Sequence, residues 1–154
     1  MAKAVKVDFD LLNEKLQKRG SKLTVNRKTI IDTIIESEGQ HLTVEEIYDA
    51  VKKKAPKIGV ATVYRTVTLL EEVGFLSKLY LKDSCCRYEI VNSDETHMHH
   101  HLICNTCNEV IEVQDDLLED LEESIYSKYG FEVLDHSVKF YGQCKKCREK
   151  MNKR

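Results

Sequence analysis

Four histidines and two cysteines lie within the eleven residues HMHHHLICNTC, from His97 to Cys107. Cys104 and Cys107 form a Cys-x-x-Cys pair, and Cys144 and Cys147 form a second one. Two thiolates at this spacing suit tetrahedral Zn²⁺, and two such pairs complete a four-thiolate site. Because that site has no open coordination position, the pattern predicts a zinc that stabilises the fold and performs no catalysis. The alternative is two unrelated thiol pairs, or a disulfide in an oxidised chain.

Three consecutive histidines, His99 to His101, need a separate explanation. Side chains alternate along a strand, so His99 and His101 would point to one face and His100 to the other. One metal ion does not easily use all three, whereas two sites on opposite faces can. Imidazole combined with carboxylate suits Fe²⁺, Mn²⁺ or Zn²⁺, although a single histidine can also be only solvated or hydrogen-bonded. Three glutamates lie near the cluster in chain order: Glu89, Glu112 and Glu119.

The first part of the chain predicts three short helices. Leu11, Leu12 and Leu16 form the apolar stripe of the first helix. Thr24 can cap the second helix. The segment from Thr43 to Glu46 has the pattern of a capping box and predicts the start of the third helix.

A fourth helix is predicted from Val60 to Val73, where apolar residues recur at helical spacing before Gly74. Its other face carries side chains that make a poor core and a good reader of a DNA groove: Ala61, Tyr64, Arg65 and Thr68. After Gly74 the pattern has period two, which predicts strands at Lys78–Lys82 and Arg87–Val91 with a turn at Asp83 and Ser84. Helices followed by a hairpin are typical of a winged helix-turn-helix domain.

The polar segment from Asn92 to Thr96 contains no apolar anchor and is predicted to separate two domains. Beyond it, strands are predicted at His101–Cys104 and Val110–Val113, a helix at Asp115–Tyr129 and a further strand at Phe131–Tyr141. Three side chains of that helix are expected to face inward: Leu118, Leu121 and Ile125. A domain of about 50 residues has a marginal core, so a metal held by the cysteines would stabilise it.

The predicted fold class is therefore α+β. A winged helix-turn-helix domain would occupy residues 1–91, a linker residues 92–96, and a small C-terminal α/β domain residues 97–154. Residues 1–91 hold 16 Lys and Arg against 13 Asp and Glu, a net +3, whereas residues 92–154 hold 8 against 13, a net −5. This asymmetry favours two domains with different partners.

Composition also limits the functional class. The chain is 42% hydrophobic and 32% charged, which is typical of a soluble globular protein. It shows no signal peptide and no apolar run of the roughly 20 residues that span a membrane, so we expect a cytoplasmic protein without a membrane partner. In that reducing compartment six cysteines favour metal binding or thiol chemistry over disulfides.

Two other functional classes fit the motifs less well. A zinc hydrolase or deaminase could use the histidine cluster, but the sequence lacks the HExxH, Pro-Cys-x-x-Cys and His-x-Glu signatures of such enzymes. A zinc-ribbon-like interaction module without DNA binding is the other alternative, and a metal-dependent gel shift would exclude it. We therefore expect that the protein is not an enzyme.

Three segments in order, KIGVATVYRTVTLLEEVGFL, HHHLICNTC and HSVKFYGQCKKC, resemble the ferric uptake regulator family of bacterial metal-dependent repressors. The resemblance extends from about Leu11 to Cys147. It implies a homodimer with an N-terminal winged-helix domain and a C-terminal dimerisation domain. It also implies that structural Zn²⁺ is held by Cys104, Cys107, Cys144 and Cys147.

The resemblance further implies a regulatory metal site that joins the two domains. By motif its ligands are His41, Glu89, His99, His101 and Glu112. A metal at this site would fix the angle between the domains and the spacing of two recognition helices. An additional site maps to His100, Glu119 and His136. Here the chain departs from the family pattern, because Met98 replaces a common histidine and His100 a common aspartate, although His97 could substitute.

The carboxylate ligands indicate which metal is sensed. The peroxide-sensing branch of the family typically has aspartate where Glu89 and Glu112 stand, and the zinc-sensing branch commonly places a cysteine near Glu89. Glutamate at both positions favours the iron branch, with Fe²⁺ as the regulatory metal, Mn²⁺ or Zn²⁺ as substitutes, and iron-uptake genes as targets. Cys85 and Cys86 keep the zinc-sensing alternative open, unless they are hairpin thiols with no ligand role.

The expected partner is a double-stranded DNA operator. Arg65 can donate to guanine edges or phosphate, and Tyr64 can pack on thymine methyl groups in the major groove. Lys22 and Arg27 are candidates for minor-groove or phosphate contact, and Thr62 and Thr68 complete the predicted DNA-binding set. A two-fold dimer predicts a pseudo-palindromic operator with half-sites roughly one helical turn apart. We also expect the operator to be AT-rich.

Overall fold

The structure is a computed structural model that describes residues 7–81, 85–91, 100–113, 115 and 117–152. The chain divides into two units, Met1–Asn92 and Ser93–Arg154. Three features predicted from the sequence lie outside the described residues: the turn at Asp83 and Ser84, the linker at 92–96, and the residues His97, Met98 and His99.

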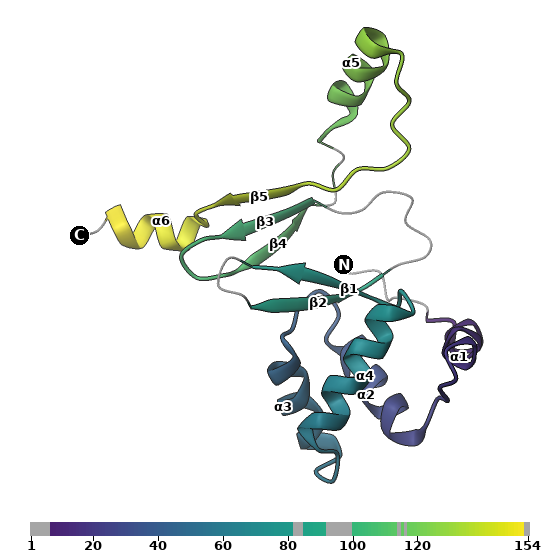
Figure 1. The fold of residues 1–154 in the computed structure, drawn as a ribbon. Helices are drawn as coiled ribbons and strands as arrows, with labels where there is room; N and C mark the ends of the chain where they lie inside the picture. The colour runs from purple at the N-terminus through teal and green to yellow at the C-terminus, as the bar shows by residue number, and fades with distance from the viewer. Residues whose placement is uncertain (1–6, 82–84, 92–99, 114, 116, 153–154) are drawn as a thin grey trace. The chain divides into compact units, whose positions relative to one another are not determined.

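In its described residues, the first unit contains four helices followed by an antiparallel hairpin (Figure 1). The helices are α1 (Phe9–Lys18), α2 (Val25–Glu36), α3 (Val44–Lys54) and α4 (Val60–Glu72). The hairpin pairs β1 (Leu76–Tyr80) with β2 (Cys86–Ile90). This is the winged helix-turn-helix order that the sequence predicted.

Side-chain caps fix where three of these helices begin. Asp8 accepts the backbone N–H groups of Asp10 and Leu11 at the start of α1. The predicted cap at Thr24 is confirmed, because its hydroxyl accepts the N–H of Arg27. The predicted capping box is also confirmed: Thr43 and Glu46 each accept the backbone N–H of the other.

The core of the first unit joins all four helices to the hairpin. Its most enclosed side chains are Leu16, Ile30, Ile31, Ile47, Val51, Val63, Val67 and Leu70. Full burial of such a side chain contributes about 1.5–3 kcal/mol, so the core fixes α4 against α2 and α3. Leu11 is an exception to the predicted stripe of α1, because 44% of it is exposed on the outer side of the helix.

The hairpin begins two residues earlier than the alternating pattern predicted. Leu76 pairs with Ile90, and Tyr88 lies in the middle of β2. Leu76 and Tyr88 both belong to the core of the unit, so burial extends the pairing beyond the visible polar and apolar alternation.

The second unit contains a three-stranded sheet with β3 in the centre (Figure 1). The strand β3 (His100–Cys104) is antiparallel to β4 (Val110–Val113) and parallel to β5 (Lys139–Gly142). Two helices complete the unit, α5 (Glu119–Tyr129) and α6 (Lys145–Asn152).

Two predictions for the second unit were wrong in detail. The strand predicted at Phe131–Tyr141 is limited to β5, because β3 is short and offers partners only to Lys139–Gly142. The helix predicted from Asp115 begins at Glu119, and none of its residues is buried. Leu121 is 54% exposed, and Leu118 and Ile125 are half-buried, so the described residues cover the expected inward face only in part.

The structure confirms the α+β fold class, with an N-terminal winged helix and a small C-terminal α/β unit. Within the described part of the chain, no helix combines the length and apolar character needed to cross a membrane.

Candidate metal sites and nucleic-acid interface

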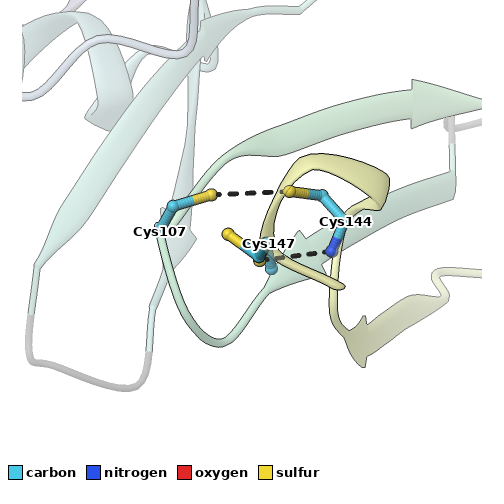
Figure 2. Close-up of side chains that lie close together, drawn as sticks. Cys107, Cys144 and Cys147 are labelled. Carbon is cyan, nitrogen blue, oxygen red and sulfur yellow. Dashed lines mark hydrogen bonds between the residues drawn. The ribbon is translucent and has the colours of Figure 1, made fainter. Parts of the chain in front are cut away.

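The four cysteines of the second unit converge on one point. Their sulfur atoms all lie within 4.8 Å of one another, and the sulfurs of Cys107 and Cys144 are 3.7 Å apart. A tetrahedral zinc with Zn–S bonds of about 2.3 Å requires sulfurs about 3.8 Å apart. Figure 2 shows the sulfurs of Cys107, Cys144 and Cys147 turned toward one another. The donor set and its spacing therefore fit a tetrahedral Zn²⁺.

The turn between β3 and β4 positions the first cysteine pair. Cys104 is the last residue of β3, and its carbonyl accepts the N–H of Asn108 at 2.9 Å. Asn108 has a φ of 57°, in the left-handed region that asparagine tolerates better than most residues. Cys104 then donates its N–H to the carbonyl of Glu109 at 2.9 Å, which returns the chain toward β4.

The start of α6 positions the second pair. Asn105 donates its N–H to the carbonyl of Gly142 at 2.8 Å, so the end of β5 lies against the first turn. Cys144 donates its backbone N–H to the sulfur of Cys104 at 3.3 Å. Its own carbonyl accepts from Arg148 at 3.0 Å, and the first turn of α6 carries the buried Cys147.

The thiols of the cluster differ in pKa. Backbone N–H groups, first that of Cys144 and then those of Cys107 and Thr106, lower the pKa of Cys104 to about 6. Hydrogen bonds to the thiol groups of Cys107 and Cys144, together with burial, raise the pKa of Cys147 to about 12. The thiolate of Cys104 therefore forms at a lower pH than that of Cys147, and a cation bound by the sulfurs would favour the ionised form of both.

The first unit contains an imidazole–carboxylate pair. Nε2 of His41 lies 3.1 Å from Oε2 of Glu89, and His41 is buried. His41 lies two residues before Thr43, the first residue of the capping box of α3, whereas Glu89 lies in β2. An isolated bridge between Leu42 and Tyr88 holds the two segments together, with the N–H of Tyr88 donating to the carbonyl of Leu42 at 2.9 Å.

The second unit contains a matching pair. His101 of β3 lies directly opposite Glu112 of β4 in the antiparallel register. Residues in that relation have Cβ atoms about 4.5–5.5 Å apart, so both side chains can reach one ion. His101 is buried and Glu112 is half-buried. The fifth predicted ligand, His99, lies outside the described residues.

His100 has different neighbours from His101. It is 2% exposed, its ring stacks on His136 with centroids 5.1 Å apart, and it meets the ring of Phe140 edge-on at 6.5 Å. Its Nδ1 atom is buried and has no hydrogen-bond partner among the residues that the structure describes. The carboxylate that contacts Nδ1 of His136 belongs to Glu122, whereas the side chain of the predicted Glu119 is exposed. Glu122 follows Glu119 by one helical turn, a spacing that could have suggested it.

The exposed face of α4 is the candidate nucleic-acid interface. Tyr64, Arg65 and Thr68 are exposed, and Thr62 beside them is half-buried. The residues between them, Val63, Thr66 and Val67, are buried in the core. The helix therefore keeps one side for the fold and leaves the other accessible.

The two cations predicted near the start of α2 differ in their surroundings. Lys22 is exposed. Arg27 is half-buried, and its guanidinium donates to the carbonyl of Lys22. Arg27 therefore also orders the segment that presents Lys22.

Comparison with known proteins adds independent findings. Residues 18–141 match the family model described as the ferric uptake regulator family. The chain is 40% identical over 142 residues to the ferric uptake regulation protein of Bacillus subtilis, covering 92% of this chain and 95% of that protein. It is 33% identical over 137 residues to the peroxide-responsive repressor PerR of Staphylococcus epidermidis, covering 89% and 88%. Among solved structures, the chain is similar to the Helicobacter pylori ferric uptake regulator, which has three functional metal binding sites. The TM-score is 0.80 and the identity 28%, and the match covers 96% of this chain and 97% of that chain.

Proposed function

Because the chain belongs to the ferric uptake regulator family, whose members are metal-responsive transcription regulators and not enzymes, we propose that it is a cytoplasmic repressor that senses Fe²⁺ and controls iron-uptake genes. The observation that carries the proposal is the presence in each unit of one histidine paired with one glutamate: His41 with Glu89, and His101 with Glu112. These donors suit Fe²⁺. Similarity to the ferric uptake regulation protein of Bacillus subtilis supports the iron assignment.

One regulatory ion would take ligands from both units. His41 and Glu89 supply an imidazole and a carboxylate from the first unit. His101 and Glu112 supply the same donors from the second, with His99 as a further ligand. The bound ion would supply positive charge that neutralises the carboxylates and a link between two units of the chain. Mn²⁺ or Zn²⁺ can substitute because they accept the same donors.

A second ion, structural Zn²⁺, would occupy the cluster of Cys104, Cys107, Cys144 and Cys147. The spacing of the four sulfurs supports this assignment. All four ligands come from the second unit, so this zinc would stabilise that unit irrespective of the regulatory ion. An additional metal site would use His100 and His136, with the carboxylate of Glu122 or Glu119.

The DNA complex would use the exposed face of α4 in the major groove. Arg65 would donate to guanine edges or phosphate, and Tyr64 would pack on thymine methyl groups. Thr62 and Thr68 would contact the same groove, while Lys22 and Arg27 would contact phosphates or the minor groove. The operator is expected to be pseudo-palindromic and AT-rich, with one half-site for each protomer.

The homodimer interface would form on the second unit. Exposed apolar side chains gather on α5 and the segment after it: Leu121, Tyr126, Tyr129, Phe131 and Leu134. Such a group of exposed apolar residues marks an interaction surface, and a second copy of the chain covers it in this proposal.

An anaerobic titration tests the proposed function. An operator is first selected from a randomised AT-rich duplex pool in the presence of Mn²⁺. Binding of the zinc-loaded protein to that operator is then followed while Fe²⁺, Mn²⁺ or Zn²⁺ is added. Tightening of DNA binding by Fe²⁺ at the lowest concentration supports the proposal, whereas a response to Zn²⁺ alone would contradict the iron assignment.

A peroxide sensor is the second candidate, supported by the similarity to PerR of Staphylococcus epidermidis. The Fe²⁺-loaded protein would then lose operator binding after addition of stoichiometric H₂O₂, and mass spectrometry would detect oxygen added to the protein. Retention of both operator binding and mass under the same treatment supports the iron-sensing assignment.

A further inference from the structure

The backbone of His41 adopts a conformation that needs support. Its φ of 37° lies in the left-handed region, which residues with a Cβ atom rarely adopt. Non-glycine residues in this region persist only where the surrounding structure holds them, often at ligand-binding positions. His41 also carries the imidazole that the proposed regulatory site uses. What holds this residue therefore affects whether the imidazole is presented to a metal.

Three consecutive residues of β2 hold the His41 segment. Arg87 donates from Nη1 to the carbonyl oxygen of His41 at 2.8 Å. Tyr88 donates its backbone N–H to the carbonyl of Leu42 at 2.9 Å. Glu89 places Oε2 at 3.1 Å from Nε2 of His41. Of the three, only Arg87 contacts the backbone of His41 itself through a side chain, so it can be changed without altering a ligand.

The same guanidinium nitrogen also faces α3. Nη1 of Arg87 lies 3.3 Å from Oε2 of Glu46. That carboxylate oxygen accepts the N–H of Thr43 at 2.8 Å in the capping box of α3. Arg87 therefore connects the carbonyl of His41 to the first turn of α3. Val44, Ile47 and Val51 of α3 share a core with Val63 and Val67 of α4, so the contact continues to the candidate recognition helix.

The burial of Arg87 distinguishes it from an ordinary surface cation. Its side chain is 21% exposed, and its Nε atom is buried without a hydrogen-bond partner in the described ranges. Arg19 provides a comparison in the same unit. It contacts the carbonyl and the carboxylate of Glu72, both at 3.4 Å, but its side chain is 56% exposed. Burying the Nε–H donor without a partner is unfavourable. The contacts of Nη1 with His41 and Glu46 must therefore hold the side chain of Arg87 in this position.

We infer that Arg87 is a positioning residue of the regulatory metal site: it keeps His41 in its ligand conformation and connects that site to α3. This inference rests on the proposed function, because it assumes that His41 binds the regulatory ion. If loss of Arg87 lowers the population of the ligand conformation to about a tenth, the apparent Kd for the metal rises about tenfold. Metal binding would also tighten DNA binding less, because the connection through Glu46 is lost.

The test compares four full-length, zinc-loaded variants with the wild-type protein: Arg87→Ala, Arg87→Lys, Glu46→Gln and the matched control Arg19→Ala. Mn²⁺ affinity is measured by electron paramagnetic resonance of the free ion. Zinc content, thermal unfolding without Mn²⁺ and operator binding with and without Mn²⁺ are measured on the same samples. Arg87→Ala should raise the Mn²⁺ Kd about tenfold without loss of zinc, Arg87→Lys should recover part of that loss, and Arg19→Ala should match the wild type.

Glu46→Gln separates the two parts of the inference. Glutamine can still accept from Thr43 in the capping box, but it lacks the charge that faces Arg87. The variant should keep its Mn²⁺ affinity within about threefold and show a smaller Mn²⁺-induced gain in operator affinity.

Three results would overturn these ideas in distinguishable ways. If Arg87→Ala melts at a lower temperature but binds Mn²⁺ with wild-type affinity, Arg87 stabilises the fold and does not position the metal site. If Arg87→Ala does not fold, the other two variants decide. The inference is overturned if Arg87→Lys and Glu46→Gln both bind Mn²⁺ with wild-type affinity and both show the wild-type gain in operator affinity. A wild-type protein that binds no Mn²⁺ beyond its zinc would instead overturn the proposed function before any variant is compared.

Discussion

The cysteine cluster and the histidine–glutamate pairs use the chain in opposite ways. All four cysteines belong to the second unit, and their sulfurs lie within 4.8 Å of one another. The histidine–glutamate pairs are divided, with His41 and Glu89 in the first unit and His101 and Glu112 in the second. A metal ligated by one unit can stabilise only that unit. A metal ligated by both can change how the units act on a third partner, such as DNA.

This difference has a thermodynamic consequence. A ligand shifts a conformational equilibrium only by its difference in affinity for the two states. Zinc that takes all its ligands from the second unit should bind with nearly the same affinity in every arrangement of the two units. An ion that needs ligands from both units binds only the arrangement that assembles them, so its concentration becomes a signal. Four changes, from the largest expected effect to the smallest, test this distinction.

Replacing a ligand of the cysteine cluster should damage the fold. Cys144→Ser removes one of four zinc ligands, and structural zinc sites contribute on the order of 10–16 kcal/mol in zinc-finger peptides. We expect loss of bound zinc and of cooperative unfolding of the second unit, measured by metal analysis and circular dichroism. Cys85→Ser removes an exposed thiol of the first unit and should retain full zinc. Equal zinc content in both variants would contradict the four-cysteine site.

Replacing a histidine of either pair should abolish the response and leave the fold. His41→Ala and His101→Ala should each raise the Mn²⁺ Kd by about 100-fold or more, because loss of even an outer-shell partner costs 10–100-fold. Zinc content should not change. Glu123→Ala, which removes an exposed carboxylate of α5 that belongs to neither pair, serves as the control. If only one of the two alanine variants loses Mn²⁺ affinity, the pairs do not share one ion.

Replacing Arg65 should separate DNA binding from metal binding. Arg65→Ala removes a contact worth about 1–3 kcal/mol, which corresponds to a loss of operator affinity of about 5- to 150-fold in a fluorescence anisotropy titration. Zinc and Mn²⁺ binding should stay at wild-type values. Arg148→Ala, an exposed arginine of α6, controls for the loss of one positive charge. Unaltered operator affinity in Arg65→Ala would remove this residue from the interface.

The smallest effect is expected at the capping box of α3. Thr43→Ala removes the cap at the N-terminus of this helix and should lower the free energy of unfolding of the first unit by about 1 kcal/mol. Urea denaturation followed by circular dichroism measures this change. Thr68→Ala, within α4, provides a matched control that caps no helix. A decrease in zinc content in Thr43→Ala would show that the two units are not independent in stability.

Features that depend on neighbouring residues were predictable from the sequence. The caps at Thr24 and Thr43 were correct because a side chain and a backbone N–H three residues later decide them. The exposed face of α4 was also correct, because its apolar spacing fixes which side enters the core. The cysteine spacing predicted a cluster, and the structure brings the four sulfurs together.

Features that depend on distant packing were not predictable. The inward face expected for Leu121 is exposed, because helical periodicity shows that a face is apolar but not which molecule covers it. The strand predicted from Phe131 is short because its partner β3 is short. Glu122 was missed as the partner of His136, because the choice between two glutamates one turn apart depends on how the helix and the following segment meet.

The parallel pairing of β5 with β3 gives the zinc cluster a further consequence. Side chains alternate along a strand, so a shift of β5 by a single residue would exchange its two faces. Phe140 would then leave the ring of His100, and the N–H of Cys144 would leave the sulfur of Cys104. The contacts of the cysteine cluster therefore fix the register of β5 against β3. Through that register, the cluster also determines that the ring of Phe140 lies beside the buried His100 at the other end of β3.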